Sequence, residues 1–171
     1  LFRSDSGIVR TTYMGTGGID LVFGLKFDKK GYPYIMGTTT GSWPISPAGI
    51  FGNANSGQFI CKLQPDLSSF VYTTSFGTGG NLPNISPIAF MVDRCENVYV
   101  SGWGGGLNGT GPQATNQQYH QGNTNGLPEV NPLPNIPNAD GADFYFFVLE
   151  RDAQRQLYGS YFGQTGGFAD H

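Results

Sequence analysis

The sequence predicts an all-β fold because of its low charge, its glycine and aromatic content, and an internal repeat. Only 12% of the 171 residues are charged, which is about half the usual share and removes many of the Lys and Glu side chains that favour helices. Glycine occurs 27 times, and aromatic residues make up 14% of the chain. This composition is typical of short strands joined by tight turns.

The repeat is marked by a phrase that ends in glycine. The phrase reads TTYMG, then TTSFG, then a looser GSYFG, and it ends at Gly15, Gly77 and Gly163. The segments that lead into these glycines align without a gap: 1–15, 63–77 and 149–163. A recurring unit of this kind indicates an array of similar supersecondary elements.

Each complete unit contains four short β-like runs bounded by turn sequences. In the first unit the runs are 21–28, 33–39, 57–63 and 69–76. Four antiparallel strands per repeat are the signature of a β-propeller blade. We therefore expect about two complete blades and partial blades at each end, all within a single β-propeller domain at 1–171. The expected boundaries are 1–15 for the end of a preceding blade, 16–77 and 78–163 for the two blades, 103–141 for a loop insertion in the second blade, and 164–171 for the start of the next.

Structural roles are expected for the recurring glycines and aspartates. Gly15, Gly77 and Gly163 follow an outer strand, where glycine lets the chain turn with positive φ. A phosphate-binding loop is the competing interpretation, but neither a Gly-Lys-Ser/Thr motif nor a helical pattern follows.

The aspartates Asp28, Asp93 and Asp143 recur at strand ends, where an Asp side chain can accept backbone N–H groups and fix a turn. Paired carboxylates could instead perform acid–base chemistry. Repetition favours the turn role, because a catalytic residue need occur only once. The aligned repeats also differ at two positions. Gly57 in the first unit aligns with Asp143 in the second, and Glu96 in the second unit aligns with Gly31 in the first.

Several classes of partner are disfavoured by charge and hydropathy. The net charge is −3, and the nine basic residues are scattered, so we expect no nucleic-acid partner. No apolar run approaches the roughly 18 residues of a transmembrane segment. The histidines are His120 and His171; with no metal spacing around them we expect no metal site, no cofactor and no catalytic residue, although Ca²⁺ remains an open alternative.

The cysteines leave their pairing open. Cys61 and Cys95 permit one disulfide, but a buried Cys61 with an unpaired turn thiol at Cys95 is also compatible with the sequence, as is a Cys95 that bonds outside this sequence. The strand residues Phe90 and Phe146 are expected in the core.

The insertion suggests one candidate binding surface. It is rich in Asn, Gln, Gly and Pro and almost uncharged, which is typical of a long loop. Trp103, Asn116 and Tyr119 are candidates for glycan contact by stacking and hydrogen bonding. The alternative is that Trp103 packs between blades and the loop covers the core.

The segments SPIAFMVDRCENVYVSGWGGG (86–106) and DGADFYFFVLERDAQRQLYGSYFGQTGG (140–167) resemble the SBBP-like propeller repeats of large gliding-motility-associated surface proteins of Bacteroidetes. The resemblance implies export by the type IX secretion system and an extracellular location at the cell surface, associated with the outer membrane. It also implies a non-enzymatic interaction or scaffold module in adhesion or gliding motility. Its partners would be other blades or domains of the same large protein, and cell-surface proteins or glycans. The alternative is a carbohydrate-binding or carbohydrate-active propeller whose site lies partly outside this sequence.

Overall fold

The prediction of an all-β fold is confirmed by the computed structural model, which describes residues 7, 10–104, 122–134 and 141–163. This part of the chain forms eight named strands and one short 3-10 helix, η3 (Arg151–Ala153). Sheet A contains β1 (Asp20–Phe27), β2 (Pro33–Thr39), β3 (Gln58–Leu63) and β4 (Phe70–Phe76). Sheet B contains β5 (Ser86–Val92), β6 (Val98–Trp103), β7 (Phe144–Leu149) and β8 (Gln156–Phe162). Both are four-stranded antiparallel meanders in sequence order, as the sequence predicts.

The two sheets have the same strand pairing and shift register at equivalent positions. The first pair of strands shifts register between Val22 and Gly24 in sheet A and between Pro87 and Ala89 in sheet B. The last pair shifts at Lys62/Leu63 and at Val148/Leu149, which are aligned positions. This shared pattern of bulges identifies the equivalent residues of the two sheets. It therefore shows which face of sheet A is equivalent to which face of sheet B.

The outer strand of each sheet carries a bridge from the preceding long loop. Ser46 pairs with Thr73 on β4, and Val130 pairs with Gly159 on β8. These bridges occupy backbone groups that an exposed edge strand would otherwise offer to another chain.

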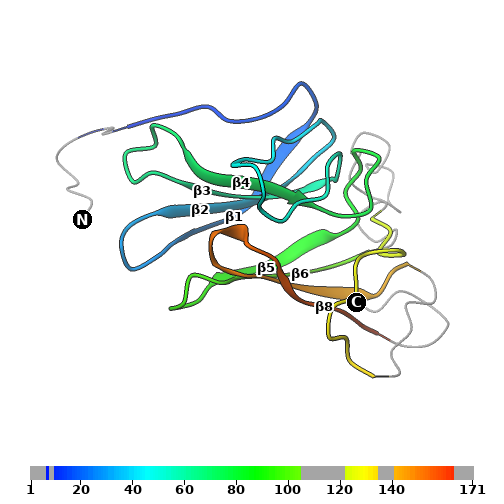
Figure 1. Cartoon of the computed structure of the whole chain (residues 1–171). Helices are drawn as coiled ribbons and strands as arrows, with labels where there is room; N and C mark the ends of the chain where they lie inside the picture. Colours follow the sequence, from blue (N-terminus) through cyan, green and yellow to red (C-terminus); the bar gives the residue numbers. More distant parts are fainter. Residues whose placement is uncertain (1–6, 8–9, 105–121, 135–140, 164–171) are drawn as a thin grey trace.

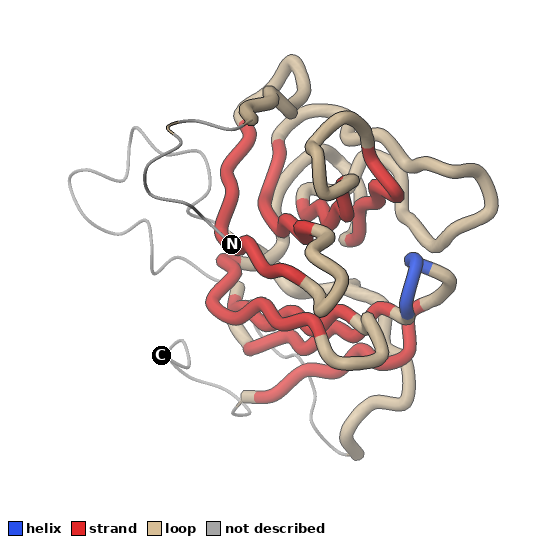
Figure 2. The backbone as a smooth tube through the Cα atoms, turned by 90° about the vertical axis from the view of Figure 1, so that its left-hand side faces the viewer, coloured by secondary structure: helices blue, strands red, loops and turns tan. Residues whose placement is uncertain are grey.

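The core lies between the two sheets, which stack as two layers (Figure 1). The inner face of sheet A contributes Tyr34, Met36, Ile60, Tyr72 and Phe76, and the inner face of sheet B contributes Val98, Val100, Tyr145, Phe147 and Leu149. The rings of Phe76 and Phe147 stack across the interface, with centroids 4.1 Å apart. Viewed from the side, η3 lies at the rim of this stack, away from the sheet centres (Figure 2).

The faces that meet in this core are not equivalent faces. Tyr34, Ile60 and Tyr72 lie on the inner face of sheet A. Their aligned counterparts in sheet B are Tyr99, Phe146 and Tyr158, and the register places them on the opposite, outer face. The inner face of sheet A therefore corresponds to the outer face of sheet B. The two sheets stack in the same orientation, which we call head to tail, and not as the mirrored halves of a closed sandwich.

The first strands of the two sheets lie next to each other. Phe90 of β5 packs over Gly24 of β1, where an added Cβ would lie 2.5 Å from the Phe90 ring. Phe90 is partly buried and packs against the core, although it is not one of the fully buried core residues. The expectation that Phe146 lies in the core is wrong: this side chain is 38% exposed on the outer face, because the neighbouring Phe147 takes the inner position on β7.

The glycine that ends the phrase has a similar backbone conformation in the first two copies, although the residues before it differ. The φ of Gly15 is +158° and that of Gly77, after β4, is +143°, and Gly163 is half-buried after β8. Residues 11–15, expected to close an outer strand, form no strand in the described chain, since no neighbouring strand pairs with them. Asp20 nevertheless accepts a hydrogen bond of 2.6 Å from the N–H of Thr16, just after Gly15, and Asn84 caps Thr78 after Gly77 in the same way at 3.0 Å.

The close approach of a loop explains why Gly57 replaces the aspartate of the other repeat. A Cβ at Gly57 would collide with the backbone of Leu82 and Pro83. We expect Gly57→Ala to lower the free energy of unfolding by about 2 kcal/mol, because backbone atoms cannot move aside cheaply. Urea denaturation measures this. Gly17→Ala, where the added methyl group meets open space, is the control and is expected to change stability by less than about 1 kcal/mol; equal effects of the two substitutions would contradict the steric explanation.

Candidate functional site: an ion-pair cluster between the sheets

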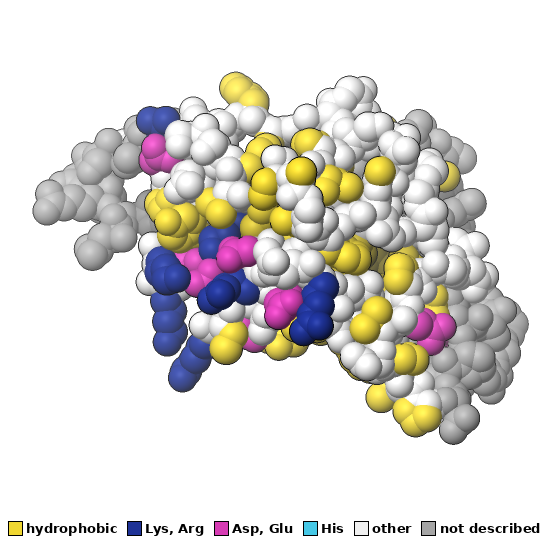
Figure 3. Space-filling model, viewed as in Figure 1, with side chains coloured by type: hydrophobic (Ala, Val, Ile, Leu, Met, Phe, Trp, Pro, Cys, Tyr) yellow, Lys and Arg dark blue, Asp and Glu magenta, His cyan; other side chains and the backbone are white. Residues whose placement is uncertain are grey.

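Charged side chains gather where the strand-connecting turns of both sheets meet. Acidic and basic side chains lie together on this face of the molecule, bordered by apolar surface (Figure 3). The centre of the cluster is Lys62, on the inner face of β3 and only 4% exposed. A lysine this deeply buried needs partners to stay charged.

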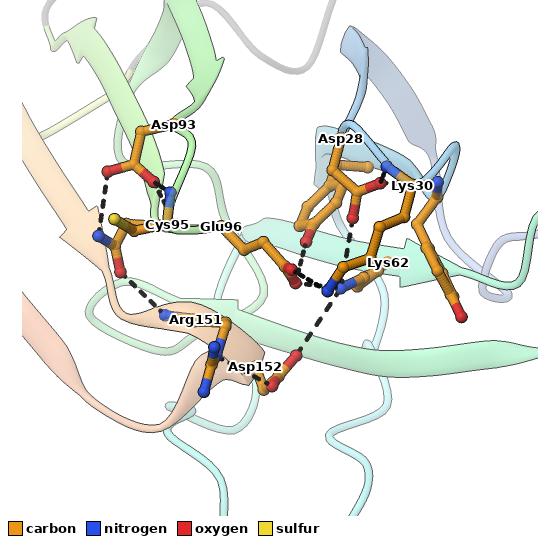
Figure 4. Close-up of polar contacts among 11 residues, drawn as sticks. Asp28, Lys30, Lys62, Asp93, Cys95, Glu96, Arg151 and Asp152 are labelled. Atoms are coloured by element: carbon orange, nitrogen blue, oxygen red, sulfur yellow. Dashed lines mark hydrogen bonds and ion pairs between the residues drawn. The ribbon is translucent and has the colours of Figure 1, made fainter.

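Those partners come from three separate turns. The Lys62 Nζ lies 2.7 Å from Glu96 Oε2, 3.6 Å from Asp28 Oδ2 and 3.8 Å from Asp152 Oδ1. Figure 4 shows Glu96 reaching from the turn after β5 towards Lys62 and Lys30, which both belong to sheet A. The cluster therefore joins the two sheets.

Aromatic rings complete the surroundings of the ammonium group. The Lys62 Nζ lies 4.8 Å from the centre of the Tyr32 ring and 5.0 Å from that of Tyr34. Such positions above an aromatic face are favourable for a cation. The Tyr34 hydroxyl also donates a hydrogen bond of 3.5 Å to Glu96.

The ion pairs hold both central groups in their charged forms. Burial alone would lower the pKa of Lys62, but its hydrogen bonds with Glu96 and Tyr34 outweigh burial and raise it. Hydrogen bonds from Lys30 and Lys62 lower the pKa of Glu96 to about 2. A group that transfers protons near neutral pH needs a pKa near that pH, and both shifts move away from it. Both groups therefore stay charged, and we call the ion pair of Lys62 and Glu96, which joins the two sheets, the clamp.

Beside the clamp lies an open depression of about 300 Å³. Its charged lining residues are the basic Lys30, Lys62 and Arg151 and the acidic Glu96 and Asp152.

Lys62 was not among the residues that the sequence singled out, and Glu96 was noted only as a departure from the repeat. Glu96 sits at φ of +69°, at the turn position that Gly31 occupies in sheet A with φ of +86°. A non-glycine residue in this conformation is unusual. The available signals were the departure from the repeat at Glu96 and a lysine among the mainly apolar residues of β3.

The aspartates singled out by the sequence lie at strand ends. Asp28 Oδ1 accepts backbone hydrogen bonds from Lys30 and Tyr32, at 2.8 and 3.0 Å. Asp93 makes the equivalent bonds with Cys95 and Asn97, at 2.7 and 2.9 Å. Burial would raise the pKa of Asp93, but these bonds and those from the side chains of Asn97 and Tyr99 lower it.

Asp143 is buried immediately before β7, and its carbonyl accepts the N–H of Gly104 at 3.3 Å.

The candidate glycan contacts are not brought together by the described residues. Trp103 ends β6 on the outer face of sheet B, half-buried, and its ring meets Phe144 edge-on at 5.9 Å. Its indole N–H has no hydrogen-bond partner in the described part of the chain. Asn116 and Tyr119 lie outside the described residues, as do His120 and His171, so the glycan hypothesis stays a prediction.

The two cysteines do not pair with each other. Cys61 is buried in β3, and burial raises the pKa of its thiol to about 12, whereas Cys95 is exposed in the turn after β5. Both are free thiols, and a bond from Cys95 to a partner outside this sequence remains a prediction.

Within the described ranges, no group of three or more His, Cys, Asp or Glu side chains is placed to hold a metal ion. The same residues include no helix long and apolar enough to span a membrane. No protein-family model matches the chain, and a search of curated proteins finds no match either.

Proposed function

We propose that this chain is a section of a β-propeller that serves as a non-enzymatic interaction or scaffold module. The observation that carries the proposal is the head-to-tail stacking of two equivalent four-stranded sheets. In a stack of this kind the inner face of one sheet corresponds to the outer face of the next, so the two sheets are related by a step that can be repeated. Propellers are built by repeating such a step around an axis.

The placement of the first strands supports the same proposal. β1 and β5 lie side by side, with Phe90 against Gly24. In a propeller, the first strands of successive blades lie next to each other around the central axis. The bridged strands β4 and β8 would then form the outer rim.

The chemistry of the charged cluster favours a structural role over catalysis. Lys62 and Glu96 hold each other charged across a wide pH range and tie sheet A to sheet B. A clamp that resists sliding of one sheet over the other suits a module that transmits load or holds other domains apart.

A location at the cell surface, with a role in adhesion or gliding motility, is the part of the proposal that rests on the sequence resemblance to SBBP-like repeats. The glycine and aromatic content of the chain and its low net charge are compatible with contacts to neighbouring domains, surface proteins or glycans.

Amide hydrogen exchange tests whether the stack behaves as one scaffold unit. We expect the central strands β3 and β7, one from each sheet, to exchange with the same free energy of opening, because they share one core. Glu96→Gln should lower both values equally. Protection of β7 without protection of β3, or the reverse, would contradict a scaffold of mutually dependent sheets.

A further inference from the structure

We propose that the outer face of sheet B binds a further four-stranded sheet of the same repeat, one with a small side chain at the position of Phe90 and an uncharged one at the position of Glu96. The inference rests on the proposed propeller section and deepens it, because it states which kind of sheet can follow sheet B. It excludes a sheet with the residues of sheet B itself.

The outer face of sheet B is equivalent to a face that a sheet already covers, the inner face of sheet A. Ile60 is 0% exposed on that inner face, whereas its counterpart Phe146 is 38% exposed. Phe76 is 1% exposed, whereas its counterpart Phe162 is 53% exposed. The same positions are therefore buried where a sheet lies against them and open on the outer face of sheet B, and exposed apolar surface of this kind marks an interaction site.

No charge on this face opposes its burial. The rows of paired residues that cross it, from the row joining Ser86 to Phe162 to the row joining Met91 to Tyr158, contain no charged residue. A sheet that covers these rows therefore leaves no side chain of sheet B as a buried, unpaired charge.

The loop contact at the edge of this face does not block it. The N–H of Leu133 donates to Ser160 Oγ, at 3.0 Å, on the outermost strand β8. Ser160 aligns with Thr74, whose hydroxyl donates to the carbonyl of Phe51 where the two sheets meet. Phe51 in turn meets Phe147 of the sheet that lies there, at 5.7 Å. A loop residue at this position is thus compatible with a sheet on the same face.

The first selective position is Ala89 on β5, which aligns with Gly24 of β1. A Cβ at Gly24 would lie 2.5 Å from a ring carbon of Phe90 and 2.9 Å from two atoms at the base of that ring, so rotation of the ring alone does not relieve the clash. Ala89 carries this Cβ. A sheet placed on sheet B in the same way therefore has no room for a phenylalanine at the position of Phe90, whereas a side chain without the ring leaves one close contact that a small shift relieves.

The second selective position is the one that Glu96 occupies. Where sheets A and B meet, Glu96 is balanced by Lys30 and Lys62, each at 2.7 Å. The equivalent residues of sheet B are Cys95 and Val148, which carry no charge. An acidic side chain brought to this place by a further sheet would be covered without these basic partners, which is strongly unfavourable.

The hydroxyl that assists Glu96 is also engaged elsewhere on sheet B. Tyr34 donates to Glu96 at 3.5 Å, whereas its counterpart Tyr99 donates to Asp93, in its own turn, at 3.1 Å. The three equivalent positions of sheet B thus offer an acidic side chain neither a cation nor a free hydroxyl group.

Both positions select in the same direction. The inner face of sheet A accepts a sheet with Phe90 and Glu96, and the outer face of sheet B rejects one. Specificity of this kind comes from contacts that disfavour the wrong partner as much as from contacts that favour the right one. The two faces therefore take different sheets, which fixes the order of sheets in the stack.

An added repeat tests the proposal on the full chain. A second copy of residues 78–163 is joined after Gly163, which aligns with the Gly77 that precedes this unit. One form of the added repeat is unchanged, and the other contains Phe90→Ala and Glu96→Gly. A lone four-stranded sheet leaves its apolar face uncovered, so an added repeat that finds no partner face stays open to proteases.

Limited proteolysis followed by mass spectrometry measures how long each added repeat survives. We expect the form with both substitutions to survive at least about tenfold longer than the unchanged form, because cleavage follows the population of the open state.

Matched changes in the original sheet B provide the controls. Ala89→Gly with Val148→Lys gives its outer face the residues that sheet A has at Gly24 and Lys62, and on this background we expect the unchanged repeat to survive longer than the substituted one. Phe146→Glu places a charge in the middle row of the face and gives the survival time of a repeat that is not bound. Circular dichroism and thermal melting of the 171-residue chain with the same changes show that sheet B keeps its fold.

Equal survival of the two forms on the natural face would mean that these positions do not select, and the proposal would be wrong. Survival of both forms only as long as with Phe146→Glu would mean that the face binds no further sheet of this repeat, which also overturns it. In either case, equal exchange protection of β3 and β7 in the 171-residue chain leaves the proposed scaffold intact, whereas unequal protection contradicts the scaffold as well.

Discussion

Replacing Phe147 with alanine is expected to lower the free energy of unfolding by about 4 kcal/mol. The Phe147 side chain is 1% exposed. It stacks on Phe76 of the other sheet at 4.1 Å and meets Phe51 of the covering loop at 5.7 Å. Truncation would open a cavity at the centre of the sheet interface, and the rigid strands around it cannot close the gap.

The neighbouring residue provides a control with the same chemistry. Phe146→Ala removes the same ring from the same strand, but from the exposed outer face, so we expect a loss of about 1 kcal/mol. Urea denaturation compares the two. Losses of similar size would mean that the inner and outer faces of sheet B are assigned wrongly.

This pair of residues also shows how far the sequence alone could predict the fold. The strands, their order and their antiparallel pairing followed from the repeat and from the turn residues. The run FYFFVL of β7 is apolar at every position, so its alternation does not distinguish the two faces. The sequence placed Phe146 in the core for this reason, and the choice between Phe146 and Phe147 depends on how the second sheet is seated.

The ion-pair cluster escaped prediction for a different physical reason. Lys62 and Glu96 are far apart in the sequence and belong to different sheets, so no local spacing connects them. Sequence comparison of the repeats emphasises what recurs, such as Asp28 and Asp93, and these residues do bind their own turns. The clamp is built from the positions where the repeats differ, and their meaning appears only once the sheets are stacked.

Loss of the clamp is expected to depend on pH in a defined direction. Glu96→Gln should lower the free energy of unfolding at pH 7 by about 2 kcal/mol, because Lys62 stays buried with only the more distant Asp28 and Asp152 to balance it. The pKa of Glu96 is lowered from 4.5 to about 2 in the folded protein. The stability contributed by its carboxylate is therefore fully present above about pH 4.5 and is lost as the pH falls towards 2.

Urea denaturation between pH 7 and pH 2 measures this difference. The unmodified chain and Glu96→Gln should converge in stability as the pH approaches 2, since protonated Glu96 resembles glutamine. The double variant Lys62→Met with Glu96→Gln is expected to recover much of the loss at pH 7, because it removes the buried charge together with its partner. A Glu96→Gln variant with the stability of the unmodified chain at pH 7 would show that Asp28 and Asp152 suffice to balance Lys62. In that case Glu96 would contribute no net stability to the contact between the sheets, and the positive φ of its turn would serve only to redirect the chain.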